Sequence, residues 1–145
     1  MSNYVERIKE LALPPHEYVV IGSGILDALG IRKARDIDIV ASKKLFKELS
    51  SNRKVWKKKW FFLGFMERKA IQKDGVEIYS RFKYRNYKYD FQAIADRVIV
   101  VDEIPFMNLD DLIELKKHLG RPKDLKDIKL IEEYKKNTKQ KTSFD

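Results

Sequence analysis

The sequence predicts an α/β (α+β) fold, in which a mixed β-sheet is flanked by helices and two further helices close the chain. Three observations indicate this class. Strand-like and helix-like runs alternate in the first third of the sequence. Asp74-Gly75 in the middle is a strong turn signal between two strand-like runs. Two capped helical segments then follow one another near the end. Strands mixed with helices in this way are typical of a sheet covered by helices.

The first element is expected to be a helix that begins at Asn3 and runs to about Leu13. Asn3 followed by Glu6 matches a capping box, in which each side chain satisfies a free backbone N–H of the first turn. Pro14 and Pro15 cannot continue the helix and therefore end it.

Two strands and two helices are predicted next. Residues 17–22 (EYVVIG) are a hydrophobic run typical of a buried strand. Residues 23–29 form a short helix ended by Gly30. Residues 35–41 (RDIDIVA) read as a second strand, and residues 42–49 as a helix capped by Ser42.

The middle of the chain predicts mostly strands. Residues 55–65 (VWKKKWFFLGF) are ambiguous and are expected to hold a short strand. Residues 67–82 predict a β-hairpin that turns at Asp74-Gly75. Residues 89–98 look helical, and residues 98–103 predict a short strand.

Two helices are expected at the C-terminal end. One is capped by Asn108, runs to His118 and stops at Gly120. The next has Pro122 in its first turn and runs to about Lys136. Residues 1–137 are thus expected to form a single domain, and residues 138–145 a flexible, frayed tail.

Composition restricts the chemistry. The chain has 145 residues, a net charge of +9 and no cysteine, which excludes disulfides, zinc thiolate sites and cysteine nucleophiles. With only two histidines, a metal site would have to use carboxylates, which bind hard cations such as Mg²⁺ or Mn²⁺. No apolar run is long enough to span a membrane, so we expect no membrane partner. We expect a cytoplasmic protein. The positive charge favours a polyanionic partner, although lysines also serve solubility alone.

One stretch combines a glycine-rich turn with paired acids. Gly22-Ser23-Gly24 follows a strand and opens a helix, an arrangement that binds phosphate well, but it matches neither a dinucleotide-binding fingerprint nor a Walker A loop. Asp36 and Asp38 alternate with isoleucines and therefore point to the same face of a strand. Alone, the pair would suit a solvated edge strand or salt bridges to nearby basic residues, which are Arg32, Lys33 and Arg35.

Residues 19–40 together resemble the signature of the DNA polymerase β-type nucleotidyltransferase superfamily. The resemblance implies a nucleotidyltransferase-like fold in which Asp36 and Asp38 are catalytic and bind two Mg²⁺ or Mn²⁺ ions. It also implies that Gly22, Ser23 and Gly24 hold the triphosphate of an NTP. A third catalytic and metal-binding acid is expected on a later strand. Glu77 is the candidate, with Asp90 as the alternative, and Glu77 could also be an ordinary hairpin residue.

The C-terminal part is similar to small stand-alone members of this superfamily, including toxin-like and abortive-infection proteins. The similarity rests on a helix ending in LIELK, followed by RPKDLKD. It implies that Lys116 and Arg121 face the nucleotide phosphates. The alternative is that Asp124 and Asp127 only stabilise a helix N-terminus and that the lysines lie on the surface.

The resemblance implies a metal-dependent transfer of a nucleoside monophosphate from an NTP to an acceptor hydroxyl, with release of pyrophosphate. RNA is the favoured acceptor because the surface is basic. Residues 81–91 and 51–62 interleave basic and aromatic side chains, which could follow a phosphate backbone and stack on bases. The same rings could instead pack inside, with the lysines in water. The alternative function is a non-catalytic nucleic-acid-binding or toxin–antitoxin-type partner protein on this fold. A homodimer or a helical partner protein could supply the acceptor site that so short a chain lacks.

Overall fold

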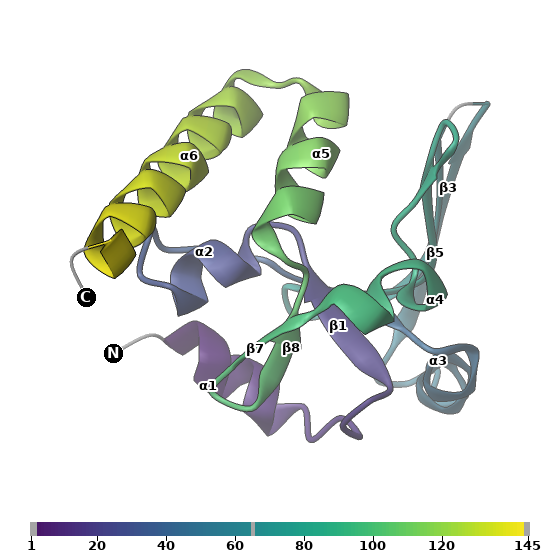
Figure 1. Ribbon diagram of the computed structural model, residues 1–145. Helices are drawn as coiled ribbons and strands as arrows, with labels where there is room; N and C mark the ends of the chain where they lie inside the picture. The colour runs from purple at the N-terminus through teal and green to yellow at the C-terminus, as the bar shows by residue number, and fades with distance from the viewer. Residues whose placement is uncertain (1–2, 65, 144–145) are drawn as a thin grey trace.

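The computed structural model describes residues 3–64 and 66–143, and one mixed β-sheet forms the centre of this part of the chain (Figure 1). Its eight described strands are β1 (Tyr18–Ile21), β2 (Ile37–Ala41), β3 (Lys57–Leu63), β4 (Met66–Lys73), β5 (Val76–Tyr84), β6 (Tyr87–Lys88), β7 (Ile99–Val101) and β8 (Ile104–Phe106). They lie in the order β3-β4-β5-β2-β1-β8-β7, with β6 beside β5. The β2–β5 and β1–β8 pairs are parallel and the others antiparallel. The mixed sheet expected from the sequence is confirmed.

The helices surround this sheet. They are α1 (Asn3–Glu10), α2 (Gly24–Ala28), α3 (Lys43–Ser50), α4 (Phe91–Ile94), α5 (Leu109–Leu119) and α6 (Pro122–Ser143), and a 3₁₀ turn, η1 (Ala95–Arg97), follows α4. α3 contacts β2 and β5, whereas α5 and α6 pack against each other. In Figure 1, α5 and α6 rise on one side of the molecule. β3, β4 and β5, which we call the strand arm, rise on the other.

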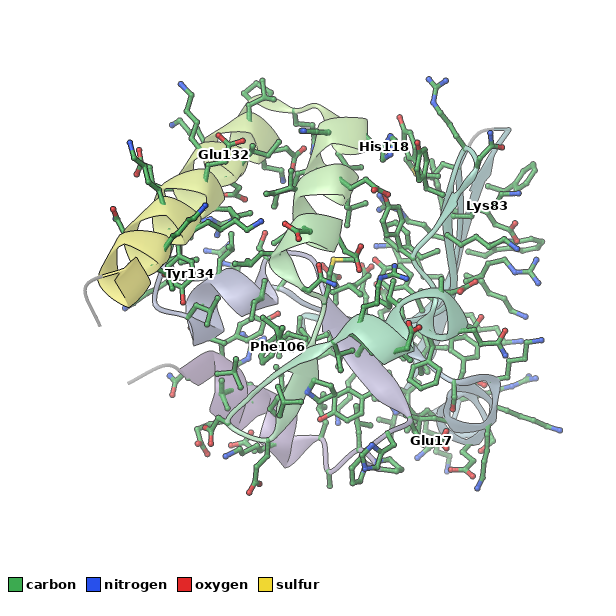
Figure 2. All side chains as sticks on the ribbon, in the orientation of Figure 1. Glu17, Lys83, Phe106, His118, Glu132 and Tyr134 are labelled. Atoms are coloured by element: carbon green, nitrogen blue, oxygen red, sulfur yellow. The ribbon has the colours of Figure 1, made fainter. Side chains whose placement is uncertain are left out.

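The centre of the sheet is the most buried part of the fold. All four residues of β1 are buried, and Asp38 is the single residue of β2 that is not. Phe106 of β8, which lies near the middle of the molecule in Figure 2, is fully buried. Aliphatic and aromatic side chains of this kind drive the folding of the sheet by removing apolar area from water. Asp38, a charged residue in the middle of this apolar sheet, therefore requires a separate explanation.

Ring contacts join the last turn of α5 to β5 and β6. His118, in the last turn of α5, faces the strand arm in Figure 2, and its ring centroid lies 4.1 Å from that of Tyr87 and 5.7 Å from that of Tyr84. Contacts between tilted rings at these distances add to the stability gained from burial. The contact links the α5–α6 pair to the strand arm.

Several helix ends lie where their capping residues predict. The Ser42 and Asn108 side chains accept hydrogen bonds from Leu45 N and Asp111 N, and Gly120 adopts the left-handed conformation that ends α5. The hairpin between β4 and β5 turns at Asp74-Gly75 as expected.

Five elements differ from the expectation. α1 ends at Glu10, three residues before Leu13, and β2 begins at Ile37, so Asp36 lies just outside the strand. β3 is a full seven-residue strand, and β8 was not expected at all. α6 continues to Ser143 instead of ending near Lys136, so most of the segment expected to fray is helical. The last two residues of that segment, 144 and 145, lie outside the described residues. Within the described residues, no helix combines the length and the apolar character that crossing a membrane requires.

Candidate active site

Asp38 and Glu77 lie side by side in the middle of the sheet. β2 and β5 run parallel with Asp38 opposite Glu77, so the two carboxylates point to the same face. On the other side of Asp38 the antiparallel strand β1 places Ile21 opposite it, immediately before the Gly22-Ser23 turn. The strand pairing thus brings the predicted acids and the predicted phosphate-binding turn to one place.

Asp36 lies at the edge of this group. It is exposed, and its backbone oxygen accepts a hydrogen bond of 2.9 Å from the Tyr4 hydroxyl, which fixes the entry to β2. Among the described residues, no ion pair joins Asp36 or Asp38 to a basic side chain. Arg32 pairs with Asp127 instead. The salt-bridge alternative for the two aspartates is therefore not what the structure shows.

The acids differ in how their charge is balanced. Burial, and after it the negative charges of Glu77 and Asp36, raise the pKa of Asp38 to about 6. Burial also acts to raise the pKa of Glu77, but hydrogen bonds from Lys59, at 2.6 Å, and from the Tyr79 hydroxyl hold it below its usual value. Asp38 thus has no direct ion pair among the described residues, and nearby positive charge offsets its own charge only in part.

A second cation lies near the acids. The positive charge of Arg68 lowers the pKa values of both Asp38 and Glu77, although burial has the larger effect on each. Its guanidinium lies over the Phe82 ring, 4.9 Å from the centroid, and its Nε is buried without a hydrogen-bond partner among the described residues. Lys59, Arg68 and Tyr79 were not predicted as site residues. The face that a strand residue takes depends on pairing that the sequence does not state.

Ser23 is held by two basic side chains. Lys116 Nζ donates to Ser23 Oγ at 3.1 Å, and an Arg32 guanidinium nitrogen donates to the same oxygen at 3.0 Å. Lys116 is only 5 % exposed and also pairs with Asp127 at 2.8 Å and with Asp124 at 3.6 Å. Lys116 is thus in contact with the glycine-serine turn, and it is not the surface lysine of the alternative reading.

Asp124 and Asp127 complete a buried charge network. Asp127 accepts two hydrogen bonds of 2.6 Å from Arg32, and Asp124 accepts from the side chain and the backbone N–H of Arg121. Burial acts to raise the pKa values of both aspartates, but the hydrogen bonds from their basic partners keep them below the usual range. Asp124 also satisfies a free N–H at the start of α6, as the alternative reading expected.

These groups line one cleft of about 470 Å³ between the sheet, α5 and the start of α6. Seven of the eight predicted site residues line it, namely Gly22, Ser23, Asp36, Asp38, Glu77, Lys116 and Arg121. Gly24 does not line the cleft. A Cβ at Gly24 would lie 2.6 Å from the Tyr4 hydroxyl, so packing explains this glycine. Gly22 has a φ of +72°, and a Cβ there would lie 3.6 Å from Asp38 Oδ2.

Two further cations, Arg35 and Lys123, stand at the cleft, both of them exposed. Among the described residues neither has an ion pair, which leaves both side chains available to a ligand. Anionic groups of a ligand could contact Arg35 and Lys123, and a metal ion bound to the ligand could contact the carboxylates of the same cleft.

The donor set suits a hard divalent cation by its chemistry. Five carboxylates line the cleft; Asp124 and Asp127 are paired with basic side chains, and Asp36, Asp38 and Glu77 are grouped at its other side. Within the described residues, however, no three acidic, histidine or cysteine side chains are grouped closely enough to hold a metal ion as they stand. Glu77 in particular is engaged by Lys59 and Tyr79. Asp38 is the most available ligand, with Asp36 and Glu77 beside it.

Comparison with protein-family models and with curated proteins finds no match. Among solved structures, the fold is similar to that of a protein described as JHP933 from Helicobacter pylori, with a TM-score of 0.38 and 14 % sequence identity. The likeness covers 69 % of this chain and 47 % of that one, so this chain spans about half the length of that protein. A likeness at this level carries no argument about function.

Proposed function

We propose that this protein is a metal-dependent nucleotidyltransferase, which moves a nucleoside monophosphate from an NTP to an acceptor hydroxyl, with RNA as the favoured acceptor. The observation that supports this best is the pairing of Asp38 with Glu77 beside the Gly22-Ser23 turn, in one cleft lined by basic side chains. The cleft combines carboxylates for cations with positive groups for phosphates, as phosphoryl transfer from a nucleotide requires.

In this proposal the Gly22-Ser23 side of the cleft binds the outer phosphates of the NTP, and the Asp38 side lies at the α-phosphate. Ser23 and the backbone at Gly22 would contact the outer phosphates, with Lys116 and Arg32 fixing the Ser23 hydroxyl. Arg121, half exposed and still paired with Asp124, and the unpaired Lys123 would add positive charge at the mouth. A phosphate placed there would have its reacting phosphorus near Asp38.

In the reaction, the acceptor hydroxyl oxygen forms a bond to the α-phosphorus, and the bond from that phosphorus to the bridging oxygen breaks. Pyrophosphate leaves with the bonding electron pair, and the hydroxyl proton passes to solvent. Two Mg²⁺ or Mn²⁺ ions, held by Asp36, Asp38 and Glu77, would supply neutralisation of the charge on the phosphate oxygens. Arg68 would add a fixed positive charge beside the reacting group.

Transfer of label from each α-labelled NTP into a mixture of small RNAs, with Mg²⁺, tests the proposal. Asp38→Asn and Glu77→Gln keep the shape of each side chain and remove its charge. The matched control is Glu133→Gln, on the exposed face of α6. We expect label in RNA with the wild type and the control, and a loss of at least about a hundredfold in both cleft variants. Equal labelling by wild type and Asp38→Asn would overturn the proposal.

A second candidate is a non-catalytic nucleic-acid-binding protein on the same fold. One observation favours it: Glu77 is already neutralised by Lys59 and Tyr79, so its carboxylate is less available to a metal ion. RNA binding by the wild type together with an absence of transfer from any NTP to any acceptor would favour this candidate.

We propose a cytoplasmic location for this activity, because NTPs, Mg²⁺ and RNA occur together there. A homodimer or a helical partner protein remains a prediction. Size-exclusion chromatography with light scattering, with and without RNA, would decide the oligomeric state.

A further inference from the structure

A second hollow of about 930 Å³, which we call the basic groove, lies between α3 and the strand arm. It is on the opposite face of the sheet from the cleft. Lys58 and Trp60 alternate with Lys59 of β3, and the extra residue Ser80 in β5 turns Lys83 to the face opposite Glu77. Its basic character comes from both elements. Seven exposed lysines line it. One is Lys59, which pairs with Glu77, and the other six are Lys43, Lys47, Lys58, Lys69, Lys83 and Lys88.

Apart from Lys59, these lysines have no acidic partner among the described residues. Among the described residues, none of the six forms an ion pair. The acids that line the groove are engaged elsewhere: Glu67 pairs with Arg81 at 3.1 Å, and Asp90 caps α4 by accepting from Ala93 N. Like charges gathered on one surface repel one another, so a polyanion bound there would stabilise the arrangement.

The groove also presents aromatic surface to water. Trp60 is 72 % exposed and lies opposite Lys69, and Phe62, two residues along the same strand, is 65 % exposed. Alternation puts both rings on the groove side of β3. Large rings left this open in a protein with an otherwise well-filled core point to a ligand that stacks on them.

We propose that the basic groove binds single-stranded RNA, with the lysines contacting phosphates and Trp60 stacking on a base. Exposed rings favour a single strand over a duplex, in which the base faces are already stacked. The cleft and the groove share Lys59 at the edge strand β3, so an RNA in the groove would have a short route around the sheet edge to Asp38. The choice of RNA rests on the proposed function, whereas the binding surface does not.

Fluorescence anisotropy with a labelled single-stranded RNA of about 12 nucleotides, without NTP and with EDTA, tests the groove. We expect Lys58→Glu/Lys83→Glu to weaken binding by about tenfold or more and to reduce its salt dependence. Trp60→Ala should weaken binding by about fivefold or more and leave the salt dependence unchanged. The control is Lys126→Glu/Lys129→Glu on α6, which changes the net charge equally and should alter affinity by less than about twofold.

Three outcomes would overturn the inference: equal weakening by the α6 control, equal affinity for duplex RNA of the same sequence, or displacement of the RNA by polyglutamate at lower concentration. The last would indicate an acidic protein partner. Quenching of tryptophan fluorescence by RNA is a second readout, because Trp60 is exposed whereas Trp56 is buried. Asp38→Asn should bind the RNA normally. If nucleotidyl transfer is the wrong function, RNA binding persists without transfer; if the groove is the wrong surface, the groove variants bind RNA as the wild type does.

Discussion

Asp38 is a carboxylate retained at the centre of a buried strand, and its cost to the metal-free protein can be measured. Its folded pKa of about 6 lies above the ordinary 3.8, so between these values the folded protein binds more protons than the unfolded chain. Stability therefore falls as the pH rises through this window and stays lower above it. Asp38→Asn removes the loss, and we expect the variant to be more stable by about 1–3 kcal/mol at pH near 8.

Urea unfolding in EDTA at several pH values checks this prediction. The difference should disappear below about pH 4, where Asp38 is protonated in both states. Mg²⁺ should stabilise the wild type and leave Asp38→Asn unchanged. If the variant were less stable than the wild type at every pH, Asp38 would have a structural partner that the present geometry does not include.

Lys59 competes with any cation for Glu77. Its ammonium lies 2.6 Å from Glu77 Oε1, yet it is more than half exposed and has no other role in the core. Lys59→Met frees that carboxylate oxygen, so we expect Mn²⁺ to bind severalfold more tightly, by about 3- to 10-fold. Isothermal titration with Mn²⁺ measures the change. An unchanged affinity, with Lys57→Met as the matched control, would argue that Glu77 is not a metal ligand.

At the scale of elements, α6 is attached to the Ser23 turn by buried charges. Asp127 pairs with Arg32 and Lys116, both of which donate to Ser23. Asp127→Asn leaves Lys116 buried with a weakened counter-charge, and we expect a loss of about 3 kcal/mol of unfolding free energy at neutral pH. Asp110→Asn, which loses one exposed pair with Lys135, should cost less than about 1 kcal/mol.

The pH dependence of this prediction follows from the lowered pKa of Asp127. A group with a lowered folded pKa contributes stability above its ordinary pKa, and this contribution is lost as the pH falls through the lowered value. The difference between wild type and Asp127→Asn should therefore be full at neutral pH and shrink below about pH 4. If the difference in unfolding free energy stayed constant down to about pH 2, lost packing and not lost charge would be its cause.

How far the sequence predicts each element depends on whether local signals decide it. The α3 and α5 caps and the Asp74-Gly75 turn are local, and the structure confirms them. β8 is three residues long and contains Pro105, so it owes its existence to pairing with β1 and β7. The end of α6 is rich in Lys, Thr and Gln, whose polarity suggested fraying, although lysine and glutamine favour helix.

The same distinction holds in the site. The glycine-serine turn and the two aspartates are close in sequence, so their proximity in space could be predicted from the single stretch that holds β1, α2 and β2. Glu77 could be suggested by its pattern, but its position opposite Asp38 follows from a parallel pairing between distant strands. The roles of Lys59 and Arg68 could not be predicted, because the face that each occupies depends on strand register and on the bulge at Ser80 of β5, opposite Lys69 and Ala70.

At the scale of the whole molecule, one sheet separates two basic surfaces with different neighbours. The cleft holds acids between its cations, whereas the basic groove holds unpaired lysines and exposed rings. A net charge of +9 is thus distributed so that one face suits a nucleotide with metal ions and the other a strand of nucleic acid. The two faces should therefore respond independently to substitution.

This independence is the last prediction. Asp38→Asn should abolish transfer and leave RNA affinity within about twofold, because it lies across the sheet from the lysines. Lys58→Glu/Lys83→Glu should raise the RNA concentration that half-saturates transfer and leave NTP affinity unchanged. In the combined variant, the change in RNA-binding free energy should equal the sum of the separate changes to within about 0.5 kcal/mol. A larger coupling, measured by anisotropy at one salt concentration, would mean that RNA contacts the carboxylate site itself, and that the cleft and the groove form one continuous binding surface.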